Sequence, residues 1–257
     1  MKIALINPYE LGRQPFGLAE PAAFLKRDGH AVTCCDLSIQ KLDDCLTADT
    51  GIVAIYIAMH TATRIAIEAL PKIKQLAPNA SLCVYGLYAP MNAELFRSLG
   101  VMTVIGGEFE YGLCDMAGRI QSGKGERQTE PETRLDKIQF IAPDRDTLPE
   151  LSRYAQLINT DGSTQTVGFS ETTRGCKYLC RHCPVVPVYQ GKFYVIPADI
   201  VLADIRAQIK AGATHISFGD PDFFNGPGHA LRIVRSLHDE FTDISYDATI
   251  KIEHIIS

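Results

Sequence analysis

The chain has 257 residues, of which 46% are hydrophobic and 21% are charged, a composition typical of a globular protein with one large domain or two of ordinary size. No apolar run is long enough to span a bilayer, and the short apolar start ends at Asn7-Pro8, so we expect no signal peptide. The net charge of −5 provides no basic stripe for nucleic acid, so we expect a cytoplasmic protein with neither a membrane nor a nucleic acid as partner.

The first 120 residues alternate strand patterns with helix patterns. Apolar, strand-like runs occupy 2–6, 30–35, 51–57, 81–85 and 102–105, and helical patterns occupy 18–27, 62–76, 92–99 and 111–120. Strands separated by helices indicate parallel crossover units with helices on both faces of the sheet. The sequence therefore predicts an α/β fold, a flavodoxin- or Rossmann-like doubly wound parallel sheet, over residues 1–120.

Residues 121–164 change character and are interpreted as a linker and connector. The first part is polar and rich in glycine, and a proline-punctuated segment, 138–149, follows it.

The alternation resumes over residues 165–257. Strands are expected at 165–170, 214–219 and 245–252, with helices at 197–211 and around Leu231, Val234, Leu237 and Phe241. At about 30 residues per unit, this length suffices for about three units of a βα barrel.

Three of the eight cysteines lie in one short segment between the first of these strands and the first helix. Cys176, Cys180 and Cys183 have the spacing C-x3-C-x2-C. Three thiolates so close together can hold three corners of a four-iron four-sulfur cluster and leave the fourth iron without a protein ligand. A zinc site made of these cysteines and His182 is the main alternative, and a buried helix face is another.

The other five cysteines are scattered through apolar segments. We expect reduced, buried thiols and no disulfide framework, as in a reducing compartment. These residues are Cys34, Cys35, Cys45, Cys83 and Cys114.

The segment 173–184 resembles the signature of the radical S-adenosylmethionine enzymes. The resemblance implies that Cys176, Cys180 and Cys183 bind a [4Fe-4S] cluster and that His182 packs near the adenine of S-adenosylmethionine. It implies an enzyme that cleaves S-adenosylmethionine reductively to a 5'-deoxyadenosyl radical, which abstracts hydrogen from a substrate that the sequence does not name. An electron donor such as a flavodoxin or ferredoxin is implied as a partner.

The same resemblance suggests roles for residues after the later strands. The residues Gly219, Asp220 and Asp222 follow the second strand. At this place members of the family have a segment with glycine and acidic residues, which accepts hydrogen bonds from the ammonium of S-adenosylmethionine. Asp220 is the first candidate and Asp222 the second, and a plain acidic turn is the alternative. Farther along, Lys251 could bind the methionine carboxylate and Glu253 a ribose hydroxyl, unless these residues form the solvent-exposed face of an edge strand.

The layout of residues 1–120 before such a motif resembles a cobalamin-binding domain. Segments 85–88 and 104–110 lie where these domains place glycine turns along the nucleotide tail. The Asp-x-His-x-x-Gly motif that supplies a lower histidine ligand is absent from 7–17, so a bound cobalamin would lack that ligand. The alternative is a Rossmann-like scaffold without this ligand.

The family's partial barrel normally has six units, and about three are expected here. We therefore expect the N-terminal part of a longer enzyme, or a barrel completed by a partner chain or by self-association through its open edge. Two other functions stay open: a non-catalytic binding module with structural zinc, and an iron-sulfur electron carrier.

Overall fold

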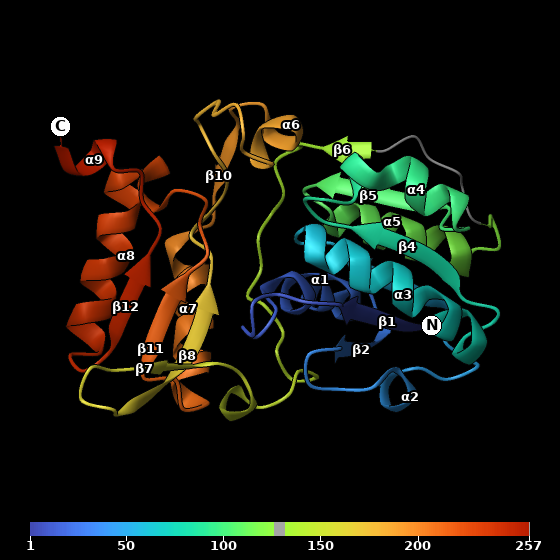
Figure 1. The fold of residues 1–257 in the computed structure, drawn as a ribbon, viewed down its shortest axis with the longest axis horizontal. Helices are drawn as coiled ribbons and strands as arrows, with labels where there is room; N and C mark the ends of the chain where they lie inside the picture. The colour runs from blue at the N-terminus through green and yellow to red at the C-terminus, as the bar shows by residue number, and fades with distance from the viewer. Residues whose placement is uncertain (126–131, 257) are drawn as a thin grey trace. The chain divides into compact units, whose positions relative to one another are not determined.

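The computed structural model describes residues 1–125 and 132–256, and the chain divides into two compact units (Figure 1). Unit 1 consists of Met1–Leu11 with Gly17–Leu148, and unit 2 of Gly12–Phe16 with Pro149–Ser257. Part of the predicted linker, 126–131, lies outside the described residues; residues 132–148 belong to unit 1 and residues 149–164 to unit 2. In the described part of the chain, no helix combines the length and the apolar character needed to cross a membrane.

Unit 1 contains a parallel sheet with the strand order β2-β1-β3-β4-β5-β6. The strands are β1 (Lys2–Asn7), β2 (Ala31–Asp36), β3 (Ile52–Tyr56), β4 (Ser81–Tyr85), β5 (Thr103–Gly107) and β6 (Glu132–Arg134). The first five are the predicted strands in the flavodoxin order, which confirms the doubly wound α/β prediction for this unit. Strand β6 was not predicted, because its Glu-Thr-Arg sequence carries no apolar signal.

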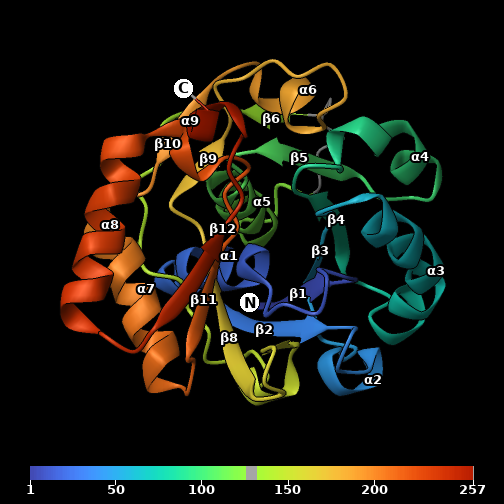
Figure 2. The ribbon, with the colours of Figure 1, turned by 60° about the vertical axis from the view of Figure 1, so that its left-hand side comes forward.

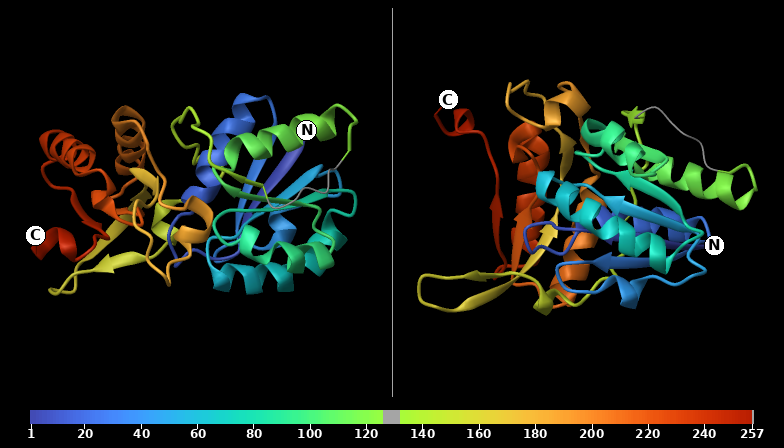
Figure 3. Two further views of the ribbon diagram at one scale, coloured as in Figure 1. Left: turned by 90° about the horizontal axis from the view of Figure 1, so that it is seen from above. Right: turned by 45° about the vertical axis from the view of Figure 1, so that its right-hand side comes forward.

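Helices cover both faces of this sheet, as the left panel of Figure 3 shows. They are α1 (Phe16–Arg27), α2 (Leu42–Cys45), α3 (His60–Leu76), η1 (Pro90–Asn92), α4 (Ala93–Ser98) and α5 (Glu110–Gln121). One core includes Ile73 and Phe96 from α3 and α4, and the other includes Leu18 and Leu113 from α1 and α5. Both strand faces are therefore apolar, as a doubly wound sheet requires.

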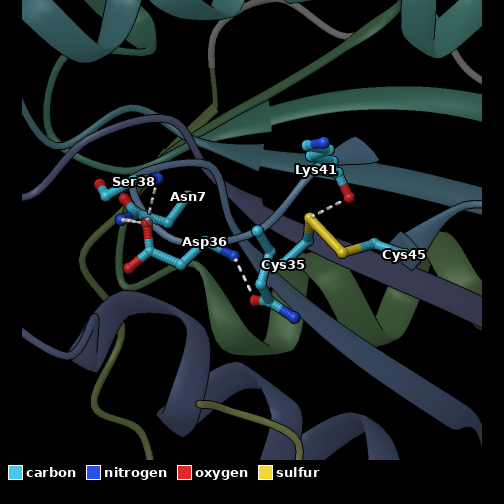
Figure 4. The surroundings of a disulfide bond; sticks show 7 residues. Asn7, Cys35, Asp36, Ser38, Lys41 and Cys45 are labelled. Carbon is cyan, nitrogen blue, oxygen red and sulfur yellow. Dashed lines mark hydrogen bonds between the residues drawn. A yellow bond between two sulfur atoms is a disulfide. The ribbon is translucent and has the colours of Figure 1, made fainter. Parts of the chain in front are cut away.

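The structure corrects the expectation that all cysteines are unpaired. Cys35 at the end of β2 and Cys45 in α2 form a disulfide, with 5.8 Å between their Cα atoms (Figure 4). The short helix α2, which the sequence did not reveal, turns Cys45 back toward β2. The other six cysteines form no disulfide.

Unit 2 contains a sheet with the strand order β12-β11-β8-β7, in which β8, β11 and β12 are parallel and β7 is antiparallel. Helices α7 and α8 lie on the same side of β8, β11 and β12 (Figure 2). The elements are η2 (Leu151–Arg153), β7 (Gln156–Ile158), β8 (Thr164–Ser170), β9 (Thr173–Gly175), α6 (Val185–Tyr189), β10 (Phe193–Val195), α7 (Ala198–Lys210), β11 (His215–Phe218), η3 (Phe223–Asn225), α8 (Pro227–Glu240), β12 (Ser245–Ala248) and α9 (Glu253–Ile256). Two successive strand-helix-strand units are therefore present, as the alternating pattern predicted.

Two local predictions in unit 2 are wrong. Strand β12 ends at Ala248, so Lys251 and Glu253 do not alternate along an extended strand, and Glu253 instead begins α9. In α8 the buried residues are Ala230, Ile233 and Leu237, whereas the predicted Leu231 is 47% exposed. The second error arises because Ala230 and Ile233 align with Leu237 on the buried face of the helix, which leaves Leu231 toward solvent.

The carboxyl of Glu110 makes the stability of unit 1 dependent on pH. Burial, and then the charge of Glu108, raise the pKa of Glu110 well above its ordinary value. The unfolded chain loses this proton at lower pH than the folded unit, so the free energy of unfolding should fall as pH rises above the ordinary pKa. The Glu110→Gln variant should gain stability relative to wild type at pH 8 and little at pH 4, measured by urea denaturation. If Glu110→Gln lowered the free energy of unfolding equally at pH 4 and pH 8, the predicted pH dependence would be wrong.

Candidate functional site

The candidate site is built on residues 176–183, which we call the cysteine loop. Strand β9 leads into it and pairs antiparallel with β10, with Gly175 opposite Phe193. Gly175 has a φ of +72°, and a Cβ at this position would meet the carbonyl oxygen of Lys192 and the ring of Tyr189. Only glycine adopts this left-handed conformation without strain. Both the backbone conformation and the packing therefore require glycine immediately before the first cysteine.

The three cysteines of the loop are free thiols, with Cys176 buried and the other two partly exposed. Burial raises the pKa of Cys176, a hydrogen bond from the backbone of Tyr178 opposes this, and charges on Asp222, Cys183 and Cys180 raise it further. The Cys180 and Cys183 thiols therefore lie within electrostatic reach of Cys176. The backbone N–H of Cys183 donates to the carbonyl of Cys180 at 3.1 Å, which closes a turn between these two ligand candidates.

The cysteine loop offers three thiols, the donor set of a four-iron cluster with one open iron. Over residues 1–125 and 132–256, no three His, Cys, Asp or Glu side chains are arranged to hold one metal ion. A zinc site built from the cysteines and His182 would require such an arrangement. In a four-iron cluster, each thiolate binds a different iron, so three separated thiols on one loop are the appropriate donors.

Asp220 holds the chain that leads into the loop. Its Oδ1 accepts hydrogen bonds from the hydroxyls of Thr172 at 2.7 Å and Thr173 at 2.6 Å, and its Oδ2 accepts one from the backbone N–H of Thr172 at 3.0 Å. Burial raises the pKa of Asp220, and these hydrogen bonds act in the opposite direction. The carboxylate predicted to meet an ammonium is thus largely engaged by its own chain. Gly219 lets β11 approach Phe169, whose ring would collide with a Cβ.

Loss of the Asp220 carboxylate should destabilise unit 2. The Asp220→Ala variant leaves one buried N–H and two buried hydroxyls without their acceptor, so the free energy of unfolding should fall by about 3 kcal/mol. Urea denaturation followed by circular dichroism measures the change. The matched control, Asp239→Ala, removes an exposed carboxylate of α8 and should change stability by less than about 0.5 kcal/mol. Equal effects of the two substitutions would contradict the assigned role.

Asp222 is fully buried and links two segments after neighbouring strands. Its Oδ1 accepts from the backbone N–H groups of Phe224 and Lys251, both at 3.3 Å. Its Oδ2 lies 2.9 Å from Nε2 of His254. This carboxylate therefore caps η3 and attaches it to the chain that follows β12.

Lys251 lies beside Tyr178 of the cysteine loop. Its Nζ is 3.7 Å from the centroid of the Tyr178 ring and 3.2 Å from Oε1 of Glu253. Burial opposes the charged form, but Glu253 and the negative charge of Cys180 raise the pKa of Lys251 above its ordinary value. His182 is exposed on the same loop. The structure thus brings Lys251, with Glu253 bound to it, next to Tyr178 of the cysteine loop.

Asn225 is a contact residue that sequence reasoning missed. Its Nδ2 donates to the carbonyl of Gly175 at 3.1 Å, and its Oδ1 accepts from the backbone N–H of Lys177 at 3.1 Å. No local pattern could have revealed this contact, because the partners are 50 and 48 residues apart in the sequence. Tyr178 and His254, 3.5 Å apart through their polar atoms, were missed for the same reason.

Comparison with known proteins gives a match at the level of the fold. No family model matches the chain. The structure of the radical S-adenosylmethionine methyltransferase TsrM from Kitasatospora setae, with cobalamin and a [4Fe-4S] cluster bound, aligns with a TM-score of 0.70 at 18% identity and covers 95% of this chain. The chain therefore shares the fold of the aligned part of that structure.

A second structure of TsrM, with tryptophan substrate and the S-adenosylmethionine analogue aza-SAM bound, aligns with a TM-score of 0.69 at 18% identity and covers 95% of this chain. In both comparisons the chain spans 52% of the length of TsrM. The likeness to the methyltransferase therefore concerns the fold of about half of that protein.

The glycine turns of unit 1 are present, but the chain itself fills the space beside them. Gly86 has a φ of +101°, and a Cβ on Gly86 or on Gly17 would meet the ring of Tyr56. That ring packs against Tyr85, with centroids 5.4 Å apart, and against Phe109 at 6.0 Å. The nucleotide tail of a cobalamin does not fit beside Gly86 in this conformation. We therefore derive no step of the chemistry from cobalamin.

Proposed function

We propose that the chain is a radical S-adenosylmethionine protein, or part of one, whose [4Fe-4S] cluster is held by Cys176, Cys180 and Cys183. The single observation that supports this most strongly is the cysteine loop: three thiols without a disulfide on one short segment that follows the carboxyl end of a parallel strand. Enzymes with barrels of parallel strands place their active sites at this end of the strands. When bound, the cluster supplies the electron that cleaves S-adenosylmethionine.

The surrounding side chains are proposed to bind S-adenosylmethionine. The Lys251 ammonium would attract the methionine carboxylate, because Tyr178 and Glu253 hold it beside the loop. Glu253, whose side chain is 61% exposed, is free to turn toward a ribose hydroxyl. The exposed ring of His182 would pack near the adenine.

The acidic residues after β11 would contribute mainly by holding the site. Asp222 fixes η3 and the start of the segment that carries Lys251. Asp220 fixes Thr172 and Thr173 and keeps part of Oδ2 available for the ammonium of S-adenosylmethionine. Gly219 allows the chain to approach closely at this point. An electron donor of the flavodoxin or ferredoxin type would reduce the cluster.

We also propose that unit 2 is the first part of a partial TIM barrel. Among the described residues, β12 pairs only with β11, so its other side offers unpaired backbone groups. Further strands, supplied by a longer chain, a partner chain or a second copy, would pair there.

The proposed function is tested by anaerobic reconstitution with iron and sulfide. The reconstituted protein should contain about four irons per chain, as a cluster with three cysteine ligands implies, and release 5'-deoxyadenosine from S-adenosylmethionine under dithionite. A variant with Cys176, Cys180 and Cys183 all replaced by alanine is the control. Equal iron in this variant would overturn the proposal. About one zinc per chain without sulfide would favour the structural zinc module instead.

A further inference from the structure

We infer that Asn225 is a positioning residue that fixes the backbone on both sides of Cys176, the first of the proposed cluster ligands. The inference rests on the proposed function for the role of Cys176, but its contacts belong to the chain alone. Asn225 would touch neither the cluster nor S-adenosylmethionine and would act through the cysteine it holds.

The geometry of the contact is specific to an amide side chain. The Nδ2 of Asn225 donates to the Gly175 carbonyl and its Oδ1 accepts from the Lys177 N–H, each at 3.1 Å. The side chain is buried, with 3% exposure. Because one partner is only an acceptor and the other only a donor, the orientation of the amide is determined. A carboxylate could accept from Lys177 but could not donate to Gly175.

The short helix η3, which carries Asn225, is held by backbone hydrogen bonds of its own. The backbone N–H of Asn225 donates to the carbonyl of Asp222 at 2.9 Å, and the N–H of Phe223 donates to the carbonyl of Thr249 at 2.8 Å. In return, Nζ of Lys177 donates to the carbonyls of Phe224 at 3.3 Å and Asn225 at 3.1 Å. The start of the cysteine loop is thus attached to η3 by four hydrogen bonds.

The contact acts on one cysteine more than on the others. Cys176 lies between the two bonded peptide groups and is buried, whereas Cys180 and Cys183 are partly exposed. Losing the Asn225 amide should therefore release Cys176 and affect Cys180 much less. Pre-organising a ligand in this way lowers the conformational entropy lost when it binds.

The test compares Asn225→Ala with Gln208→Ala in the metal-free protein. Gln208 is a matched control, since its buried amide also accepts from a backbone N–H, that of Phe169 at 2.7 Å, and donates to Asp204 at 3.0 Å. Both variants and the wild type are alkylated with N-ethylmaleimide at the same pH. The alkylation rate of each cysteine is measured from its own peptide by mass spectrometry. We expect the Cys176-to-Cys180 rate ratio to rise about tenfold in Asn225→Ala and to stay near wild type in Gln208→Ala, the order expected for losing one or two hydrogen bonds.

Asn225→Asp distinguishes the contact with the Gly175 carbonyl from the contact with the Lys177 N–H. It also provides a second variant if Asn225→Ala does not fold. It retains an acceptor for Lys177 and should raise the ratio less than alanine does. In the wild-type protein, the Lys177 amide should exchange with deuterium more slowly than the amide of exposed Arg181. An unchanged alkylation ratio in folded Asn225→Ala, or exchange at Lys177 as fast as at Arg181, would overturn the inference.

After reconstitution, Asn225→Ala should lose iron to a chelator several times faster than Gln208→Ala. The alkylation and exchange experiments contain no metal, so their outcome is independent of whether the wild type binds a cluster. If the wild-type protein contained no iron and sulfide after reconstitution, the proposed function would be wrong. If the alkylation ratio were unchanged in Asn225→Ala, only the role of Asn225 would be wrong.

Discussion

Replacing Cys176, Cys180 or Cys183 with serine, one at a time, should lower the iron content after reconstitution from about four per chain to below about one. Each thiolate is expected to bind a different iron, and the serine hydroxyl, with its far higher pKa, does not replace a thiolate. All three thiols are free and lie on one loop, so no other cysteine of unit 2 can substitute for them. Iron and sulfide analysis together with visible absorption measures the loss.

The matched control is Cys114→Ser. Cys114 is a free, partly exposed thiol of α5 in unit 1, so its replacement tests the effect of removing a cysteine elsewhere in the chain. This variant should retain the iron and sulfide of wild type. Single variants of the loop that keep wild-type iron, or equal loss in Cys114→Ser, would show that the loop does not hold the cluster.

The second large effect is expected at Gly175, where alanine should both destabilise unit 2 and disturb the cysteine loop. The φ of +72° costs an alanine about 1–2 kcal/mol. The added Cβ would also meet the Lys192 carbonyl and the Tyr189 ring, and such overpacking costs a further 1–3 kcal/mol or so. We expect a total loss of about 3 kcal/mol in the free energy of unfolding, measured by urea denaturation, and a reduced iron content after reconstitution.

Gly212→Ala separates the backbone cost from the packing cost. Gly212 also has a left-handed φ, +101°, but a Cβ there would meet no atom within 4 Å. This variant should lose only the backbone contribution, about 1–2 kcal/mol, and should bind iron as wild type does. Equal losses of stability and of iron in the two variants would contradict a special role for the packing around Gly175.

The strands of unit 1 could be predicted from the sequence because they are apolar on both faces. Residues such as Ile3, Leu5, Ile52 and Val84 mark continuous buried runs, and such runs are typical of parallel sheets. Strand β6 and the four-residue helix α2 carry no such pattern, so they could not be found. The disulfide between Cys35 and Cys45 followed from α2 and was missed with it.

The three cysteines of the loop could be selected from the sequence, because the spacing of thiols in one segment is a local property; that they bind a cluster stays a prediction. The roles of the residues that hold the loop could not be predicted. Asp220 and Asn225 contact segments 47 to 50 residues away in the sequence, so their roles depend on strand order and register. The hydrogen bonds from Thr172 and Thr173 to Asp220 could not be predicted, and its contact with S-adenosylmethionine stays a prediction.

The central claim, that three sulfur ligands leave one iron open for S-adenosylmethionine, is tested most directly by electron paramagnetic resonance. The reconstituted, dithionite-reduced protein is measured with and without S-adenosylmethionine. We expect the signal of a reduced [4Fe-4S] cluster, and a change in that signal when S-adenosylmethionine is added. A cluster signal that stays the same at saturating S-adenosylmethionine, or a protein that holds zinc and no sulfide, would contradict it.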